Sequence, residues 1–276
     1  MNQLICGQKE IAAFNALHRT PLYPYAKQHA HLGFGVTITR APVRAQPSLE
    51  SRPDQNGLDL LQECSCLPAT PVLILRKQPG WLYVQTGLCA GWMPEEAVGL
   101  TEERTARALL QQFRFYLVTD PWVEYDGEQY FMSSALPAEP DGAVLLPYRE
   151  NEMLCWRRET PREGMRLGYL AYKRCNLVSQ AVKLLGLPYD WGERDGSVDC
   201  SALTMYTYAC CGVKLPRNSG EQTAVEFPVR VLPVERACEA LAGDLLHQPG
   251  HIMLSLGGDT VVHASYTAGK VCISKL

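Results

Sequence analysis

The chain has 276 residues, of which 46% are hydrophobic and 20% are charged. This is the composition of a globular protein, and the length exceeds one typical domain of about 150 residues. A net charge of −3, without long runs of either sign, offers no basic surface for nucleic acid or for an anionic membrane. No stretch of about eighteen apolar residues is present, so no membrane-spanning helix is predicted.

The cysteines and the start of the chain bear on the compartment. The eleven cysteines are an odd number and form no CxxC pair, so we expect free thiols in a reducing compartment. Residues 1–16 contain no basic segment followed by an apolar one, so no secretory leader is predicted. We therefore expect a cytoplasmic protein. A secreted or cell-wall location is the alternative if a leader was removed.

The first third of the chain changes character once. The pattern of Gln8–Leu17 predicts a short amphipathic helix within an N-terminal segment over residues 1–30. Between residues 31 and 100, short β-type runs such as Val72–Leu75 and Trp81–Val84 alternate with turns that contain Pro and Gly. This alternation predicts a small β-barrel or sandwich.

A linker helix and a second β-rich stretch are predicted over residues 101–160. Thr101–Gln112 has the pattern of a surface helix, with Thr101 as its N-cap. From Phe113 onward, short strands such as Phe115–Val118 and Trp122–Tyr125 are separated by turn residues. We interpret this stretch as a second small β domain.

The last part of the chain, residues 161–276, mixes helices and strands. Apolar periodicity predicts helices over Asn176–Leu185 and Cys200–Cys211, each followed by a glycine. Strands are predicted over His251–Leu256 and Thr260–Ser265. The expected fold class is therefore α+β, with two small β domains before a mixed C-terminal domain.

Cys200 lies at a position that favours thiol chemistry. Asp199 is a good N-cap residue, which places Cys200 in the first turn of the predicted helix. The helix dipole and the unpaired N–H groups there are expected to lower the pKa of the thiol below its usual value of about 8.5. A buried structural cysteine is the competing interpretation.

Two histidines share one face of a predicted hairpin. With Gly257-Gly258-Asp259 as the loop, Leu256 faces Thr260 across the hairpin. His251 and His263 then lie on the same face as diagonal neighbours, about 7–8 Å apart, and the opposite face is apolar. Packing alone seldom places two histidines in this way, so the pair indicates function.

A nucleophilic thiol needs a base, and the base needs an orienting partner. Cys200, His251 and His263 can supply these three roles. The competing hypothesis is a zinc site in which Cys200 and His251 act with His247. The Pro-Gly sequence between the two histidines excludes a helix, and no acidic or CxxC companion completes the ligand set. We therefore predict no metal and no cofactor.

Six short segments of the C-terminal domain occur in the order and spacing of a known family. They are LPYDWG at 187–192, DCS at 199–201, LPRNS at 215–219, GDL at 243–245, GH at 250–251 and VHA at 262–264. Together they resemble the NlpC-type cell-wall cysteine peptidases over roughly residues 172–276. Residues 31–100 and 113–158 are similar to the two bacterial SH3-like domains of the subfamily that cleaves murein peptides.

The resemblance implies a papain-like core and a defined reaction. It implies hydrolysis of the bond between γ-D-glutamate and a diamino acid in murein tripeptides or tetrapeptides with a free N-terminal L-alanine. In this reaction Cys200 would be the nucleophile, His251 the base and His263 the orienting residue. No nucleic acid, membrane or metal partner is implied.

The resemblance also implies a set of substrate-binding residues. The pocket would be lined by residues of the matching segments, namely Tyr189, Trp191, Asp199, Ser201 and Ser219. Asp199 would pair with the substrate ammonium group, together with an acidic residue of the first SH3-like domain. The candidates for that acidic residue are Asp59 and Glu63.

Three positions depart from the family pattern. Glu193 and Ala202 stand where glycine is usual, and Cys89 stands where an aromatic residue is usual. Two other functions remain compatible with the residues. One is a catalytically weak module that binds murein peptides, and the other is an acyl transferase that uses the same Cys-His-His site.

Overall fold

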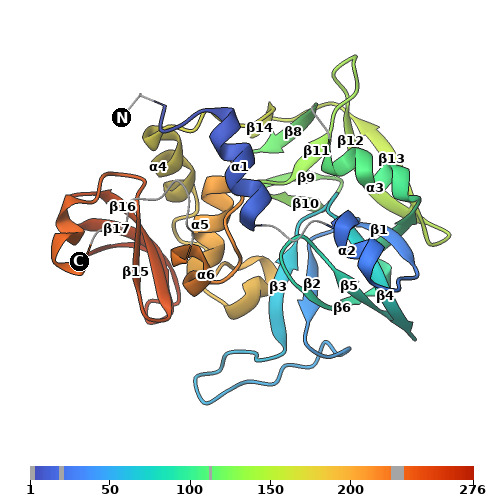
Figure 1. Ribbon diagram of the computed structural model, residues 1–276, viewed down its shortest axis with the longest axis horizontal. Helices are drawn as coiled ribbons and strands as arrows, with labels where there is room; N and C mark the ends of the chain where they lie inside the picture. The colour runs from blue at the N-terminus through green and yellow to red at the C-terminus, as the bar shows by residue number, and fades with distance from the viewer. Residues whose placement is uncertain (1–3, 19–21, 112–113, 225–232) are drawn as a thin grey trace. The chain divides into compact units, whose positions relative to one another are not determined.

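The structure is a computed structural model that describes residues 4–18, 22–111, 114–224 and 233–276. The chain folds into two compact units (Figure 1). One unit joins Met1–Arg19 to Tyr169–Leu276, and the other is Thr20–Gly168. The N-terminal helix therefore belongs with the C-terminal unit, and both predicted β-rich stretches fall in the other. None of the helices in the described ranges is long and apolar enough to cross a membrane.

The unit Thr20–Gly168 is built mainly from strands. Its elements are α2 (Leu22–Gln28), β1 (Gly33–Thr37), β2 (Ala41–Arg44), β3 (Gln62–Cys66), β4 (Pro71–Gln78), β5 (Trp81–Gln85), β6 (Ala90–Pro94), the 3-10 turn η1 (Glu95–Ala97), β7 (Val98–Thr101), α3 (Glu103–Leu110), β8 (Phe115–Val118), β9 (Trp122–Tyr125), β10 (Glu128–Phe131), β11 (Ala135–Pro137), β12 (Val144–Glu150), β13 (Met153–Glu159) and β14 (Met165–Leu167).

Most of these strands belong to one sheet. Among the described residues, nine strands pair in the order β12-β13-β7-β1-β4-β5-β6-β2-β3, and two smaller sheets are β10-β9 and β11-β8-β14. The two predicted β-rich stretches meet within the large sheet through the parallel pairing of Met153 with Leu100. Each stretch has its own buried apolar cluster, one around β1–β7 and one around β8–β13.

The predicted strands Phe115–Val118 and Trp122–Tyr125 are confirmed with the same bounds. The prediction that Thr101 caps the following helix is wrong, because Thr101 is the last residue of β7 and pairs with Phe34. The helix α3 begins at Glu103, after Glu102. Gln112 and Phe113, which the predictions included, lie outside the described residues.

A buried ion pair organises the long connection between β2 and β3. The side chain of Arg44 is 2% exposed and donates to Asp59 Oδ2 at 2.6 Å. The same guanidinium donates to the carbonyl oxygens of Ser48 and Glu50 at 2.9 and 2.7 Å. Asp59 Oδ1 in turn accepts the backbone N–H of Arg52 at 3.0 Å. Residues 45–61 therefore fold around one guanidinium rather than around a strand ladder.

The unit that contains the C-terminal domain combines helices with one sheet. Its elements are α1 (Gln8–His18), α4 (Arg174–Lys183), the 3-10 turn η2 (Trp191–Gly196), α5 (Cys200–Ala209), α6 (Ser219–Thr223), the 3-10 turn η3 (Val234–Glu239), β15 (Leu245–Gln248), β16 (His251–Gly257), β17 (Thr260–Ser265) and β18 (Lys270–Lys275). In the described residues the strands pair antiparallel in the order β15-β16-β17-β18.

The helix α5 is the centre of this unit. It packs against β16, β17 and α4 (Figure 1). Its residues 200–208 are all buried. The helix α1 is held to the same unit by Asn15, whose side-chain amide donates to the carbonyl oxygen of Gly212 and accepts the N–H of Lys214, both at 2.8 Å. Phe14 of α1 is buried, as its apolar spacing predicts.

The β16–β17 hairpin has the predicted register but a different turn. Leu254 pairs with Val262, as expected. Leu256 does not face Thr260, because Gly257 pairs with Thr260 and the register shifts between Ser255 and Gly257. A two-residue turn at Gly258-Asp259 closes the hairpin, and the bulge takes up the extra residue. Because the bulge lies beyond Leu254, the alternation of faces toward His251 is unchanged.

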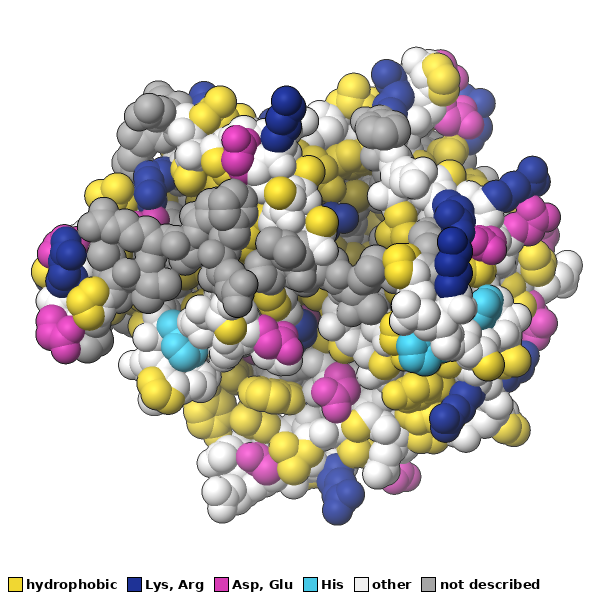
Figure 2. All heavy atoms as spheres, in the orientation of Figure 1, with side chains coloured by type: hydrophobic (Ala, Val, Ile, Leu, Met, Phe, Trp, Pro, Cys, Tyr) yellow, Lys and Arg dark blue, Asp and Glu magenta, His cyan; other side chains and the backbone are white. Residues whose placement is uncertain are grey.

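Charged side chains are mixed on the surface. On the face shown in Figure 2, the coloured Lys and Arg side chains are interspersed with Asp and Glu, and neither sign forms a large continuous patch. This distribution agrees with the near-balance of 26 basic and 29 acidic residues in the sequence.

The Arg44–Asp59 pair makes a testable prediction about stability. Replacing Asp59 by Ala leaves a buried guanidinium without its carboxylate, so we expect the free energy of unfolding to fall by about 3–5 kcal/mol. The double variant Arg44→Met/Asp59→Leu removes both charges and should be considerably more stable than Asp59→Ala. Urea unfolding followed by circular dichroism measures the difference. Glu63→Ala is the control, because Glu63 is exposed, and a loss for Asp59→Ala no larger than the control would contradict the prediction.

Candidate active site

Asp199 fixes the first turn of α5. It has the extended backbone of an N-cap residue, and its Oδ1 accepts the N–H of Ala202 at 2.8 Å. The same oxygen accepts the hydroxyl of Ser201 at 3.1 Å, and Oδ2 accepts the N–H of Gly192 at 3.1 Å. The predicted helix start at Cys200 is therefore confirmed, and the carboxylate ties it to the preceding loop.

A buried arginine holds Asp199 from the other side. Arg217 lies just before α6 and donates to Asp199 Oδ2 at 2.5 Å and to Ser201 Oγ at 2.9 Å. Burial alone raises the pKa of the Asp199 carboxyl, but the Arg217 charge and the hydrogen bonds bring it below its usual value. Asp199 is therefore ionised at neutral pH although it is only 4% exposed.

Glu193 adds a second carboxylate to this cluster. Its Oε1 lies 3.1 Å from Nε of Arg217, and its Oε2 accepts the hydroxyl of Tyr206 on α5. The backbone of Glu193 is left-handed, with φ of +68°. Glycine adopts this conformation without strain, which explains why glycine is the usual residue of the family at this position. In this chain the ion pair and the hydrogen bond offset that strain.

The two histidines are in direct contact. His251 Nε2 lies 2.7 Å from His263 Nδ1, and the rings meet at an interplanar angle of 71°. The predicted sharing of one hairpin face is confirmed, since Ile252, Leu254 and Val262 of the opposite face are fully buried. Because Nε2 of His251 is engaged by His263, Nδ1 is the nitrogen of His251 that remains for another group.

Cys200 lies beside the strand that carries His251. The thiol is near the peptide N–H of Ile252, the residue that follows His251, and this N–H favours the thiolate together with that of Ser201. Burial nevertheless raises the pKa of Cys200, and the Asp199 charge raises it further. The expectation of a lowered pKa is therefore wrong, because desolvation outweighs the helix start.

Both imidazoles are biased toward the neutral form. Burial lowers the pKa of His251, and the charges of His263 and His247 lower it further. Burial also lowers the pKa of His263. The resting site at neutral pH is therefore a protonated thiol with neutral imidazoles, which is suited to proton transfer during attack rather than to a preformed ion pair.

Three other predicted residues of this unit lie on the segments around α5. Burial raises the pKa of Tyr189, and the charges of Cys200 and Asp199 raise it further. Trp191 is 42% exposed and begins η2, the turn that leads to Asp199. Ser219 is half-buried and begins α6. Their contact with substrate stays a prediction.

The acidic residues predicted to bind the substrate amine differ in environment. Both oxygens of Asp199 already accept hydrogen bonds from the chain. Asp59 is 1% exposed and is paired with Arg44, whereas Glu63 is exposed on β3. Cys89, at the third departure from the family pattern, has its sulfur 2.8 Å from that of Cys64.

Sequence reasoning missed four side chains that contact the site. Arg217 lies inside a matching motif, but the motif suggests no role for its side chain. Glu193 stands out in the sequence only as a departure from the family pattern. The others are Cys272 and Ser274, on a strand that was not predicted. Alternating small polar residues in a C-terminal strand next to the histidine hairpin are the signal that could have found them.

In the described part of the chain, no group of three or more His, Cys, Asp or Glu side chains could hold a metal ion.

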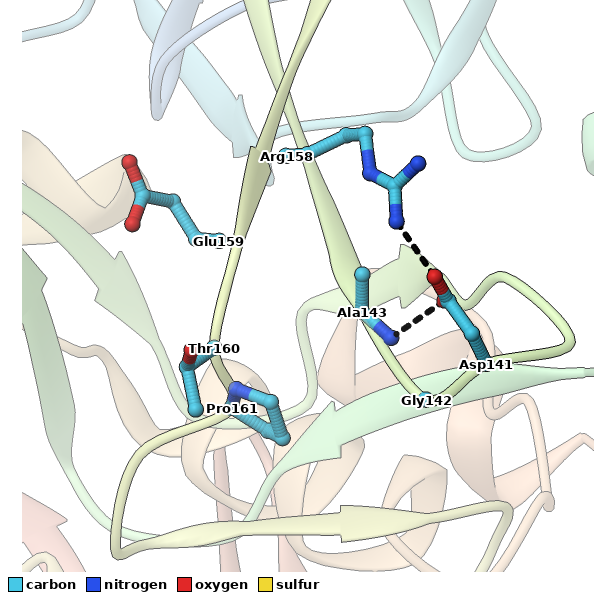
Figure 3. A pocket seen from close by; sticks show the side chains of 7 residues that line it. All are labelled: Asp141, Gly142, Ala143, Arg158, Glu159, Thr160 and Pro161. Carbon is cyan, nitrogen blue, oxygen red and sulfur yellow. Dashed lines mark hydrogen bonds and ion pairs between the residues drawn. The ribbon is translucent and has the colours of Figure 1, made fainter.

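One surface pocket of the unit Thr20–Gly168 is shown in Figure 3. Its charged groups Asp141 and Arg158 pair with each other at 2.5 Å, and its lining contains none of the predicted site residues.

Residues 186–276 match the NlpC/P60 family model. Dipeptidyl-peptidase 6 of Lysinibacillus sphaericus is 34% identical over 104 residues, which are 37% of this chain and 36% of that protein. Peptidoglycan endopeptidase RipB of Mycobacterium tuberculosis is 35% identical over 118 residues, or 36% of this chain and 46% of that protein. The chain thus matches between a third and a half of the length of these curated relatives. The match to the family model covers the C-terminal third of the chain.

Two solved structures share the fold over more of the chain. An NlpC/P60 family protein from Bacillus cereus ATCC 10987 has a TM-score of 0.67 and 20% identity, and covers 88% of this chain and 94% of that one. An NlpC/P60 endopeptidase from Photobacterium damselae subsp. piscicida has a TM-score of 0.67 and 17% identity, and covers 88% of this chain and 64% of that one. At these identities the likeness concerns the fold alone.

The left-handed backbone of Glu193 can be tested by a pair of substitutions. Both Glu193→Gly and Glu193→Ala lose the ion pair with Arg217, but only Gly relieves the strained φ. We therefore expect the Gly variant to be more stable than the Ala variant by about 1 kcal/mol in urea unfolding. The same pair at Ser179, an exposed position inside α4, should show the opposite order. An Ala variant at 193 as stable as the Gly variant would contradict a left-handed backbone.

Proposed function

We propose that this protein is a cysteine peptidase that hydrolyses the bond between γ-D-glutamate and a diamino acid in murein stem peptides with a free N-terminal L-alanine. The observation that carries the proposal is the 2.7 Å contact between the imidazoles of His251 and His263 on the β16–β17 hairpin, with the Cys200 thiol beside the strand of His251. The match of residues 186–276 to the NlpC/P60 family supports the same reaction class.

The proposed reaction begins with attack by Cys200. As the sulfur attacks the γ-carbonyl carbon of D-glutamate, Nδ1 of His251 accepts the thiol proton. The N–H of Cys200 at the start of α5 stabilises the oxyanion of the tetrahedral intermediate. His251 then gives its proton to the departing amine of the diamino acid, which leaves a thioester. Water, deprotonated by His251, hydrolyses the thioester and restores the thiol.

We propose that the substrate binds without pairing as a strand with the enzyme's backbone. The γ-D linkage does not have the geometry of an ordinary peptide strand, so recognition must come from the shape and charge of the pocket. Tyr189, Trp191 and Ser219 are proposed to line it, and Asp199 to supply negative charge toward the ammonium group of L-alanine. Asp59 is buried against Arg44, so of the two acidic candidates Glu63 has the accessible carboxylate.

Substitutions at Cys200, His251 and His263 test the nucleophile and the division of roles. Cys200→Ala should abolish release of diaminopimelate from L-Ala-γ-D-Glu-diaminopimelate, as measured by chromatography of the products. His251→Ala removes the base and should lower kcat by about 10²–10⁴-fold. His263→Ala should cost less, because water can replace an orienting group in part.

The controls separate this proposal from the other two functions. Cys238→Ala should be fully active, since Cys238 is an exposed thiol on η3. Binding of the tripeptide without release of any product would favour a binding module. A product joined to an added acceptor amine in preference to water would favour acyl transfer. Undiminished turnover by Cys200→Ala would refute the assignment of the nucleophile.

Comparing the hydrolysis of free tripeptide with that of intact sacculi distinguishes peptide recycling from wall remodelling.

The pH dependence follows from the imidazoles. A protonated His251 cannot accept the thiol proton, and burial lowers the pKa of both histidines. Activity should therefore persist as the pH falls to the usual histidine value of about 6.5 and be lost only below it. A profile of kcat/KM against pH measures this limb. An acid midpoint above 6.5 would contradict imidazoles whose pKa values are lowered by burial.

A further inference from the structure

Two side chains of β18 lie against the far nitrogen of His263. Ser274 Oγ is 3.0 Å from His263 Nε2, and Cys272 Sγ is 3.6 Å from the same nitrogen. The antiparallel register explains this placement, because His263 pairs with Cys272 and Val261 pairs with Ser274. Residues two apart on a strand share a face, so both β18 side chains lie on the histidine face of the sheet.

These contacts link the two imidazoles and the β18 side chains, so that the nitrogen carrying the proton in one ring determines which nitrogen carries it in the other. Nδ1 of His251 can accept the thiol proton only if the neutral ring carries its own proton on Nε2. That N–H points at His263 Nδ1, 2.7 Å away, so His263 Nδ1 must be without a proton. A neutral His263 then carries its proton on Nε2, and this N–H needs an acceptor.

Ser274 provides that acceptor at hydrogen-bond distance, whereas the sulfur of Cys272 is farther away and is a weak acceptor. The Ser274 hydroxyl can direct its own proton toward Cys272 Sγ, 3.9 Å away. Without Ser274, the thiol of Cys272 can donate to Nε2 of His263. This would favour a proton on Nδ1 of His263, and His251 would then have to carry its proton on Nδ1, where it can no longer act as the base.

We propose that Ser274 is a positioning residue whose hydroxyl oxygen accepts the Nε2–H of His263 and so fixes both imidazoles in the tautomers that leave Nδ1 of His251 free as the base. The proposal rests on the proposed function, since it takes His251 as the base. In this proposal the Cys272 thiol favours a proton on Nδ1 of His263, and the Ser274 hydroxyl counteracts this effect.

The test uses the full-length protein with ¹⁵N-labelled histidine. Long-range ¹H–¹⁵N spectra at about pH 7.5, where both rings are neutral, report which nitrogen carries each proton. In the parent protein we expect His251 and His263 to be protonated on Nε2. In Ser274→Ala the signals should shift toward protonation on Nδ1, and Ser274→Thr, which keeps the hydroxyl, should restore the parent spectrum. The double variant Ser274→Ala/Cys272→Ala should recover part of it, because the competing donor is gone.

Kinetics provide the second measurement. Ser274→Ala should lower kcat by about 10-fold, the effect of one hydrogen bond, with KM changed less than about twofold. Ile273→Ala is the matched control, because Ile273 is exposed on the other face of the same strand and should leave the spectrum and kcat unchanged. Thermal unfolding checks that each variant is folded.

The outcomes separate this inference from the proposed function. If the parent protein hydrolyses no murein peptide, the proposed function fails, and the spectra still decide the tautomers. If the parent protein is active but carries the His263 proton on Nδ1, the inference is overturned. It is also overturned if Ser274→Ala keeps both the parent spectrum and the parent kcat. If Ser274→Ala does not fold, a Ser274→Thr variant with an altered spectrum overturns it, and one with the parent spectrum supports it.

Discussion

The ion pair between Asp199 and Arg217 is the interaction on which the candidate site depends. Asp199 caps α5, accepts the N–H of Gly192 from the preceding loop, and is held at 2.5 Å by a guanidinium that is itself 5% exposed. Removing Arg217 would leave the buried carboxylates of Asp199 and Glu193 without a compensating charge, at a cost of several kcal/mol. The position of Cys200 is therefore determined by the rigid cluster below it.

The sheet supplies the other half of the site on separate terms. The hairpin β16–β17 packs against α5 and has a fully buried apolar face, while its two imidazoles are half-buried and burial lowers the pKa of both. Proton transfer in such a site depends on which nitrogen carries the proton rather than on a standing charge. Small hydrogen-bonding groups on the adjacent strand β18 are therefore as relevant as the histidines themselves. They connect β18 to the chemistry of α5, the helix that carries Cys200 and lies far from β18 in the sequence.

Sequence reasoning succeeded where the determinants are local. The N-cap at Asp199 and the alternation from His251 to Ser265 depend on neighbouring residues, and both are present in the structure. It failed at β18 because the strand's polar residues have meaning only through their register with β17. The Arg44–Asp59 pair joins residues 15 apart through a loop without a periodic pattern, and no local signal could identify Arg44 as the partner.

The pKa of Cys200 was also beyond sequence reasoning, because the helix start alone predicts the wrong sign. The depth of burial and the charge of Asp199 decide it. Glu193 could have been recognised as a left-handed position from the glycine expected there, but its partners Arg217 and Tyr206 come from distant segments.

The cluster of Asp199, Arg217 and Glu193 contains two carboxylates and one guanidinium, so it carries one net negative charge when all three groups are ionised. Its field acts on any reagent that approaches the sulfur. A neutral alkylating agent such as iodoacetamide approaches without an electrostatic barrier, whereas the anionic iodoacetate is repelled by the carboxylate of Asp199, which also disfavours the thiolate. Inhibitors designed against this cysteine should therefore carry a cationic or uncharged group next to the electrophile.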